Sequence, residues 1–154
     1  MLFQRINRSN PEKIFLVVYN SSATAMTNGQ AVNWDFITDR DGIGVVRPLA
    51  RATNAGVALA GIVAENIAVS GYGLIQVYGY HSAVRTRSVT SGVQGTWQQI
   101  AKGTPLYANA AGSLYCLESH STSADAILAF PCAFALAANT KWTTVAIACF
   151  IKAL

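Results

Sequence analysis

The chain has 154 residues, of which 12% are charged and 52% are apolar, and its formal net charge is +4. This length predicts one domain with a substantial core, whereas the charged fraction is far below the roughly 25% of typical soluble domains. Uncharged polar residues or other chains must therefore cover much of the surface, which predicts an oligomer, and the absence of a dense basic stripe argues against nucleic-acid binding.

The first dozen residues, MLFQRINRSNPE, combine apolar and basic side chains ahead of the first strand-like run. We predict an extended arm over residues 1–12 that grips a partner surface, with a frayed terminus as the alternative. The arm residues expected to contact the partner are Leu2, Phe3, Arg5, Ile6 and Arg8.

Strand-like runs then recur every ten to fifteen residues, and helix-like periodicity is scarce. We predict about ten short strands in one all-β domain over residues 13–154, folded as a compact β-sandwich or barrel. The Asp41-Gly42 pair before the third run is typical of a hairpin turn. The predicted strands are 13–19, 30–36, 43–49, 57–63, 73–80, 82–89, 104–107, 113–118, 127–136 and 143–152, with 90–98 as a loop.

The stretch 55–80 (AGVALAGIVAENIAVSGYGLIQVYGY) holds one charged residue, Glu65, and β-branched and aromatic residues between glycines. Such a composition predicts strands packed on at least one face. A segment this poor in acids, bases and nucleophiles is interpreted as scaffold and not as an active site.

A similar order of glycine-led short strands and apolar strands occurs twice along the chain. The first series starts near Gly29 and the second near Gly103. Two similar halves, about 25–88 and 99–154, are one interpretation. Coincidence in a chain rich in glycine and alanine is the other.

Metal and phosphate sites are not predicted. Asp35, Asp39, Asp41 and Gly42 resemble part of a calcium loop, but no glutamate follows at the required spacing, so an Asp-rich turn is favoured. The pairs at 42/44 and 71/73 are G-x-G without a following helix and are interpreted as strand kinks or bulges. The cysteines at 116, 132 and 149 lack C-x-x-C spacing and are expected to be buried thiols.

No catalytic constellation is visible either, so we expect neither an enzyme nor a cofactor. The two histidines are His81, between two predicted strands, and His120, in a polar stretch. No G-x-S-x-G motif is present, and no spacing groups the few carboxylates. The longest apolar run, 126–138, contains Pro131 and is too short for the roughly 20 residues of a membrane helix, and no signal peptide is evident.

The three tryptophans are predicted to lie at an oligomer or partner interface. Trp34 alternates with apolar neighbours, which fits core or inter-subunit packing; Trp97 lies in a polar loop; Trp142 begins the last strand. Aromatic residues are enriched at interfaces. For Trp97, contact with a partner chain, intrachain cover and a sugar-binding face remain open.

The order of Gly29–Trp34, Gly44–Leu49, GVALAGIVA (56–64), GYGLIQVYGY (71–80) and KGTPLYANAAGSL (102–114), closed by an apolar strand, resembles the capsid decoration, or cement, proteins of tailed bacteriophages. The resemblance covers roughly residues 25–154. It implies a jelly-roll or β-tulip-like fold and a head-stabilising role without catalytic residues.

The resemblance also implies partners and a location. The chain would be made in the host cytoplasm and would bind the major capsid protein on the outside of the virion as a homotrimer or homodimer, reinforcing contacts between capsomers. A carbohydrate- or receptor-binding β-module of a phage head or tail fibre, with Trp97 as part of a sugar platform, is the alternative.

Overall fold

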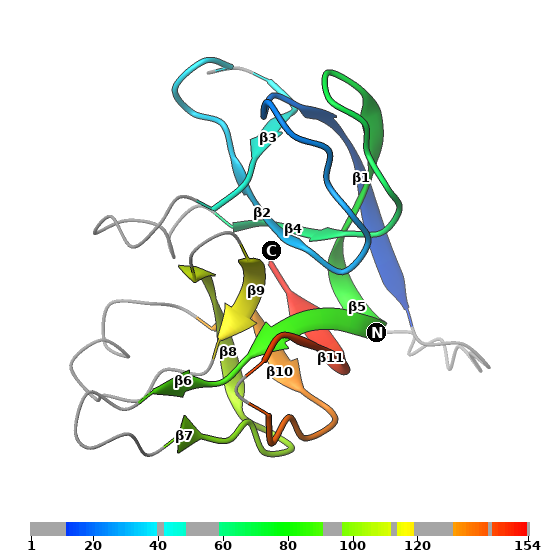
Figure 1. Cartoon of the computed structure of the whole chain (residues 1–154). Helices are drawn as coiled ribbons and strands as arrows, with labels where there is room; N and C mark the ends of the chain where they lie inside the picture. Colours follow the sequence, from blue (N-terminus) through cyan, green and yellow to red (C-terminus); the bar gives the residue numbers. More distant parts are fainter. Residues whose placement is uncertain are drawn as a thin grey trace, which may run out of the picture.

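The computed structural model describes residues 12–39, 42–48, 59–90, 97–111, 114–118, 131–141 and 143–153, and its described residues are all-β (Figure 1). They contain eleven strands and no helix, which confirms the predicted fold class. The strands are β1 (Lys13–Asn20), β2 (Ala31–Trp34), β3 (Gly44–Val46), β4 (Leu59–Val63), β5 (Tyr72–Arg87), β6 (Val89–Thr90), β7 (Trp97–Gln98), β8 (Pro105–Ala111), β9 (Leu114–Glu118), β10 (Ala133–Ala135) and β11 (Val145–Lys152).

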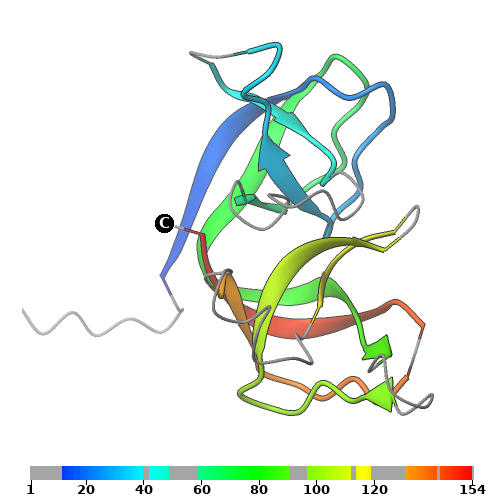
Figure 2. The ribbon, with the colours of Figure 1, turned by 90° about the vertical axis from the view of Figure 1, so that its left-hand side faces the viewer.

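The pairing of nine strands closes two five-membered rings that share β5. The sheet order is β1-β3-β2-β4-β5-β11-β10-β8-β9, and two additional pairings, β1 with β5 and β5 with β9, close it. The first ring therefore comprises β1, β3, β2, β4 and the first part of β5, and the second comprises the rest of β5 with β11, β10, β8 and β9. Figure 2 shows the two rings one above the other, with the green strand β5 passing from one to the other.

Strand β5 is one continuous 16-residue element, where the sequence predicted two strands meeting near His81. The strand passes Gly79 at φ +98°, a conformation that L side chains rarely adopt. A Cβ at this position would lie 1.9 Å from the carbonyl oxygen of Glu12, so the backbones approach too closely for any other residue. Gly79 pairs with Lys13 of β1 and with Ile151 of β11, so the strand continues through it, contrary to the predicted junction near His81.

Each ring has its own apolar core. The first encloses side chains from all five of its strands, including Val18, Val32, Val45 and Ile75. The second encloses Val84, Leu106, Ile147 and Ile151, among others.

Strands β2 and β4 connect the two cores because they are buried on both faces. Val32 and Val63 point into the core of the first ring, whereas Ala31, Leu59 and Ile62 belong to that of the second. This double burial explains why LAGIV (59–63) reads as an apolar run without alternation. The two rings thus pack through side chains as well as through the shared strand.

The same strand pairings recur in both rings. In the first, β1 pairs with β3 in parallel, and all other pairs are antiparallel. In the second, β5 pairs with β9 in parallel, and again all other pairs are antiparallel.

The boundaries 25–88 and 99–154 remain a prediction, and the ring pairing divides the chain elsewhere. The first ring begins with β1, before residue 25, and the second uses the end of β5 as its first strand. The prediction of a single domain over 13–154 and an arm over 1–12 likewise stays a prediction, and residues 1–11 lie outside the described part.

Several predicted strands are shorter in the structure than in the sequence analysis. The run 30–36 forms a strand only over Ala31–Trp34, because Asp35 starts a turn, and the run 43–49 forms one only over Gly44–Val46. The predicted loop 90–98 is not wholly irregular: β6 and β7 pair at its two ends.

Candidate functional site

The described histidine, His81, is engaged in local structure. His81 is buried in β5, and its Nδ1 accepts a hydrogen bond from the Ala83 amide at 3.1 Å. Burial lowers the pKa of His81, with Lys13 acting in the same direction, against a hydrogen bond with the Val63 backbone. The imidazole is held by these bonds at the neck between the rings, where β5 passes from one ring to the other, and acts as a structural group. His120 lies outside the described residues.

The two aspartates that resembled a calcium loop hold a turn together. The carboxylate of Asp35 accepts hydrogen bonds from the Ile37 amide at 3.2 Å, from the Thr38 amide at 3.0 Å and from the Thr38 hydroxyl. These bonds, the hydroxyl's first, lower the pKa of Asp35 against the opposing effect of burial. Asp39 accepts from the Gly44 amide at 2.7 Å.

In the described part of this pattern, residues 36–38 form a turn that Asp35 and Asp39 stabilise, as the sequence favoured. Asp41 lies outside the described residues. Within the described ranges, no group of three or more histidine, cysteine, aspartate or glutamate side chains is placed to hold a metal ion.

Cys132 and Cys149 are free, buried thiols in the core of the second ring. The Cys132 thiol donates to the Leu106 carbonyl at 3.2 Å. Burial, with a smaller effect of Cys132, raises the pKa of Cys149 to about 12. Both therefore act as small hydrophobes, as the sequence predicted. The side chain of Cys116 lies outside the description.

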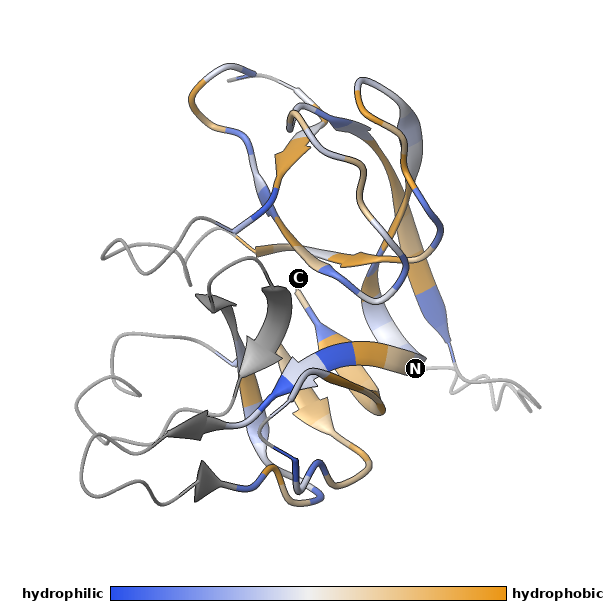
Figure 3. Cartoon of the chain, in the orientation of Figure 1, coloured by the Kyte–Doolittle hydropathy of each residue, from blue (hydrophilic) through white to orange (hydrophobic). Residues whose placement is uncertain are grey.

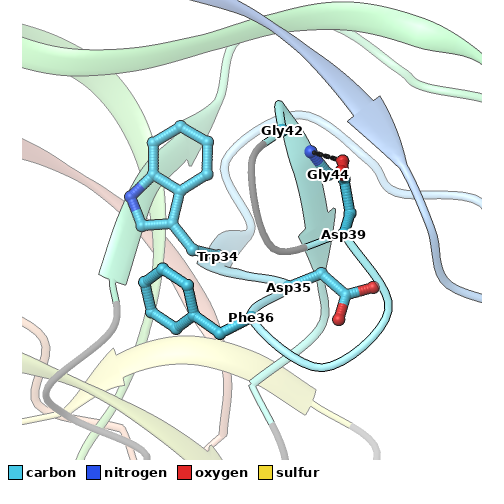
Figure 4. Close-up of a pocket in the computed structure, with 6 residues that line it drawn as sticks. All are labelled: Trp34, Asp35, Phe36, Asp39, Gly42 and Gly44. Carbon is cyan, nitrogen blue, oxygen red and sulfur yellow. Dashed lines mark hydrogen bonds between the residues drawn. The ribbon is translucent and has the colours of Figure 1, made fainter.

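A hollow of about 260 Å³ opens beside the turn that Asp35 and Asp39 stabilise (Figure 4). The rings of Trp34 and Phe36 form one side, the carboxylates of Asp35 and Asp39 lie on the other, and glycines 42 and 44 complete the lining. Phe36 is 62% exposed because the chain leaves β2 at Asp35, and Trp34 is half-buried against the core of the first ring. A hollow lined by aromatic rings and by carboxylates has the chemistry of a sugar or cation site.

A second exposed surface covers the outer faces of β1 and β5, and we call it the outer strip. Val18 points into the ring and Leu16 packs against its core, so the alternating residues of β1 face outward. Figure 3 shows that most of β1 is hydrophobic. The outer strip consists of Phe15 (43% exposed), Val17 (58% exposed), Tyr72 (68% exposed) and the half-buried Tyr19.

The outer strip is ordered by cross-strand contacts. Tyr19 pairs with Tyr72, and their ring centroids lie 5.2 Å apart. Further along, the rings of Tyr78 and Phe150 meet edge to face at 5.2 Å, which carries aromatic cover onto β11. Contiguous apolar surface of this kind commonly marks a site of protein association.

Few of the sequence-predicted interface residues fall where the structure describes their side chains. Trp34 does, and it contributes one wall of the hollow. Trp97 is in β7, and its side chain lies outside the description. The remaining predicted residues, Trp142 with Leu2, Phe3, Arg5, Ile6 and Arg8, lie outside the described residues.

The outer strip was missed by sequence reasoning. The run KIFLVVY (13–19) has no polar alternation after Lys13, so it reads as a strand buried on both faces. The low fraction of charged residues was the one available signal, because it indicated apolar surface without locating it.

Comparison of the sequence with protein-family models, curated proteins and solved structures gives no match. No helix long and apolar enough to cross a membrane occurs in the part of the chain that the structure describes.

Proposed function

We propose that this protein is a non-catalytic structural component of a bacteriophage virion that binds the outside of the capsid as an oligomer and reinforces contacts between capsomers. The single observation that carries the proposal is the outer strip, an ordered apolar surface displayed on a two-ring β-scaffold. A cement protein needs such a scaffold and such a contact surface. The sequence resemblance to capsid decoration proteins indicates which surface is bound, namely the outside of a phage capsid.

The state of the polar groups supports a binding role over a chemical one. The buried histidine donates and accepts within β-structure, and the described aspartates accept from turn amides. General acid–base catalysis requires such groups to face a substrate instead. The chain's function is therefore assigned to its surfaces.

Capsid binding would gain strength from repetition. One oligomer that spans several capsid subunits makes several contacts at once, and each contact raises the effective concentration of the next. Binding only to the assembled lattice then stabilises the head by mass action.

The test is electron cryomicroscopy of heads of the encoding phage mixed with the purified protein. We expect density at fixed symmetry positions on the outer surface. A variant that lacks residues 1–10 is expected to keep its melting temperature and to occupy fewer sites, because the predicted arm is removed. Random or absent density on intact heads contradicts the proposal, and unchanged occupancy of the truncated variant contradicts the arm.

The hollow beside Trp34 favours a second candidate, a carbohydrate- or receptor-binding module of a phage head or tail fibre. Trp34 and Phe36 offer aromatic faces for a sugar ring, and Asp39 offers a carboxylate for its hydroxyl groups. Phe36→Ala separates the two candidates, since Phe36 is largely exposed and its loss spares the core. Glycan-array binding that this variant loses supports the module, whereas lattice binding that it keeps supports the capsid role.

A further inference from the structure

In the described part of the chain, one edge of β1 is unpaired over most of its length. Along one side, Lys13 to Tyr19 pair with β5, whereas on the other side only Tyr19 and Asn20 pair with β3. The Tyr19 amide donates to the Ile43 carbonyl at 2.9 Å, and this sets which residues face that side. By the alternation of a strand, Lys13, Phe15 and Val17 direct their backbone groups to the same edge. Among the described residues, none of these backbone groups has a hydrogen-bond partner there.

The residues of β1 itself provide little of the usual protection against pairing at this edge. Edge strands are commonly blunted by proline, by a bulge on the strand itself, or by charged side chains along the edge. Lys13–Asn20 contains no proline, and its only charged residue is Lys13, at one end. The register shift near Ile14 and Phe15 places the extra residue on β5, so β1 itself keeps its regular alternation.

We propose that the open edge of β1 binds the same edge of a second copy of this chain, in an antiparallel arrangement about a twofold axis at Phe15. This inference deepens the proposed function and rests on it only for the role of the oligomer. The contact would be made by the backbone edge of β1, so that the sheet of the first ring continues into the sheet of the first ring of the second copy.

The register follows from the free groups. Only a pairing centred on Phe15 gives every free residue a free partner, with Phe15 opposite Phe15 and Lys13 opposite Val17 of the second copy. Facing residues of this kind exchange both N–H···O bonds. The open edges of both copies are then fully paired over Lys13–Val17, and the outer strips of the two copies become neighbours.

Charge selects the antiparallel arrangement over a parallel one. Glu12 and Lys13 lie at the same end of β1. A parallel copy would set lysine beside lysine and glutamate beside glutamate, which destabilises a strand pair. In the antiparallel arrangement Lys13 lies opposite Val17 and Glu12 lies opposite Val18 of the second copy. The two lysines then lie at opposite ends of the paired strands, and so do the two glutamates.

A charge-swap series tests the register by sedimentation velocity of the purified protein. Wild type is expected to form a dimer or a multiple of it. Val17→Lys places a lysine opposite Lys13 of the second copy, and the twofold axis repeats the clash, so we expect at least about tenfold weaker dimerisation. Val17→Glu is expected to retain the dimer, and the double variant Lys13→Glu/Val17→Lys is expected to restore it.

Two further variants distinguish strand pairing from non-specific hydrophobic association. Ile37→Lys changes an 80% exposed residue away from the edge and should leave the dimer unchanged. Phe15→Pro removes the central outward N–H while leaving the β5 side of the strand its bonds, and it should weaken the dimer. Circular dichroism checks that each variant is folded.

A wild type that stays monomeric at high micromolar concentration overturns the inference, and so does a Val17→Lys variant that dimerises as the wild type does. These readouts use the protein alone. A protein that dimerises in this register but does not decorate heads would therefore contradict the proposed function without touching the inference.

Discussion

Each ring contains a turn with the same backbone hydrogen bonds, but the two turns have different surroundings. Comparing them shows which residues the backbone conformation requires and which the packing requires. Gly29 and Gly103 have φ +81° and +82°, and their amides donate to the carbonyls of Val63 and Ala135, each at 2.8 Å. A β-bridge lies beside each turn, Met26 with Ile67 and Ile100 with Asn139. The hydrogen-bonded frame is thus repeated almost bond for bond.

The surroundings of the two turns differ. A Cβ on Gly29 would lie 2.2 Å from the Ala83 carbonyl oxygen of β5, whereas one on Gly103 would meet nothing within 4 Å among the atoms around it. Glycine is therefore required at 103 by its dihedral angle alone, and at 29 by its dihedral angle and by the neighbouring strand. The first ring docks its turn on the shared strand, and the second leaves its turn exposed.

The largest expected effect comes from a charge placed in either core. Val77 and Ile151 occupy matching places in the two rings, and both side chains are fully buried. Val77→Asp and Ile151→Asp should each lower the free energy of unfolding by about 4 kcal/mol, because an unpaired carboxylate would be desolvated. Chemical denaturation measures both, and Val69→Asp, in an exposed turn, is the control.

Because β5 belongs to both rings, each of these variants should still unfold in a single transition. Two separate transitions, with only the mutated ring destabilised, would show that the rings fold independently.

Alanine substitutions of Gly29 and Gly103 measure how the surroundings of the two turns affect stability. Gly29→Ala should destabilise by about 3 kcal/mol, since dihedral strain adds to the clash with β5. Gly103→Ala should cost about 1 kcal/mol, from strain alone. Thermal denaturation of the two variants measures both losses of stability. Equal losses would contradict a contribution from the packing of Gly29 against β5.

A smaller difference is expected from the side chains that close the twin turns. The Gln30 Oε1 accepts from the Thr27 amide at 2.6 Å, and the Thr104 Oγ accepts from the Ala101 amide at 3.1 Å. Gln30 is buried and Thr104 is partly exposed, so water can replace only the second bond. We expect losses of about 1.5 kcal/mol for Gln30→Ala and about 0.5 kcal/mol for Thr104→Ala by the same assay. The reverse order would contradict this account of the turns.

The neck between the rings should show a weak dependence on pH. Burial first, then Lys13, keeps the pKa of His81 below its ordinary value of 6.5 in the folded state. The unfolded chain therefore binds the proton more readily, and stability should be full above pH 6.5 and decline as the pH falls below it. His81→Gln should flatten the profile of melting temperature between pH 7 and pH 5, and parallel profiles for the two proteins would exclude His81 as the cause.

The strand content of this fold could be predicted from the sequence, whereas its closure could not. Apolar and β-branched composition located runs such as KIFLVVY (13–19) and LAGIV (59–63), because strand propensity is local. Ring closure depends on pairings between distant residues, such as Tyr19 with Gly44, that no local pattern encodes. The 16-residue strand was predicted as two strands meeting near His81, because the pairing that continues through this region, such as Gly79 with Ile151, joins distant residues.

The candidate surfaces were predictable only in part. Trp34, singled out because it alternates with Val32 on a strand, lines the hollow, and its place at an interface stays a prediction. Phe15 and Val17 are exposed because they lie on the face of β1 opposite to the core of the first ring, and which face turns outward is a tertiary property. Composition indicated that apolar surface exists but could not place it.

The central claim is that one strand, β5, joins two copies of a hydrogen-bonded frame into a single rigid scaffold. Native-state hydrogen exchange of the β5 amides tests it most directly. We expect the amides of Ile75 and Val77 in the first ring and those of Val84 and Thr86 in the second to exchange with one common free energy, equal to that of global unfolding. Two distinct free energies, divided at Gly79, would contradict the claim.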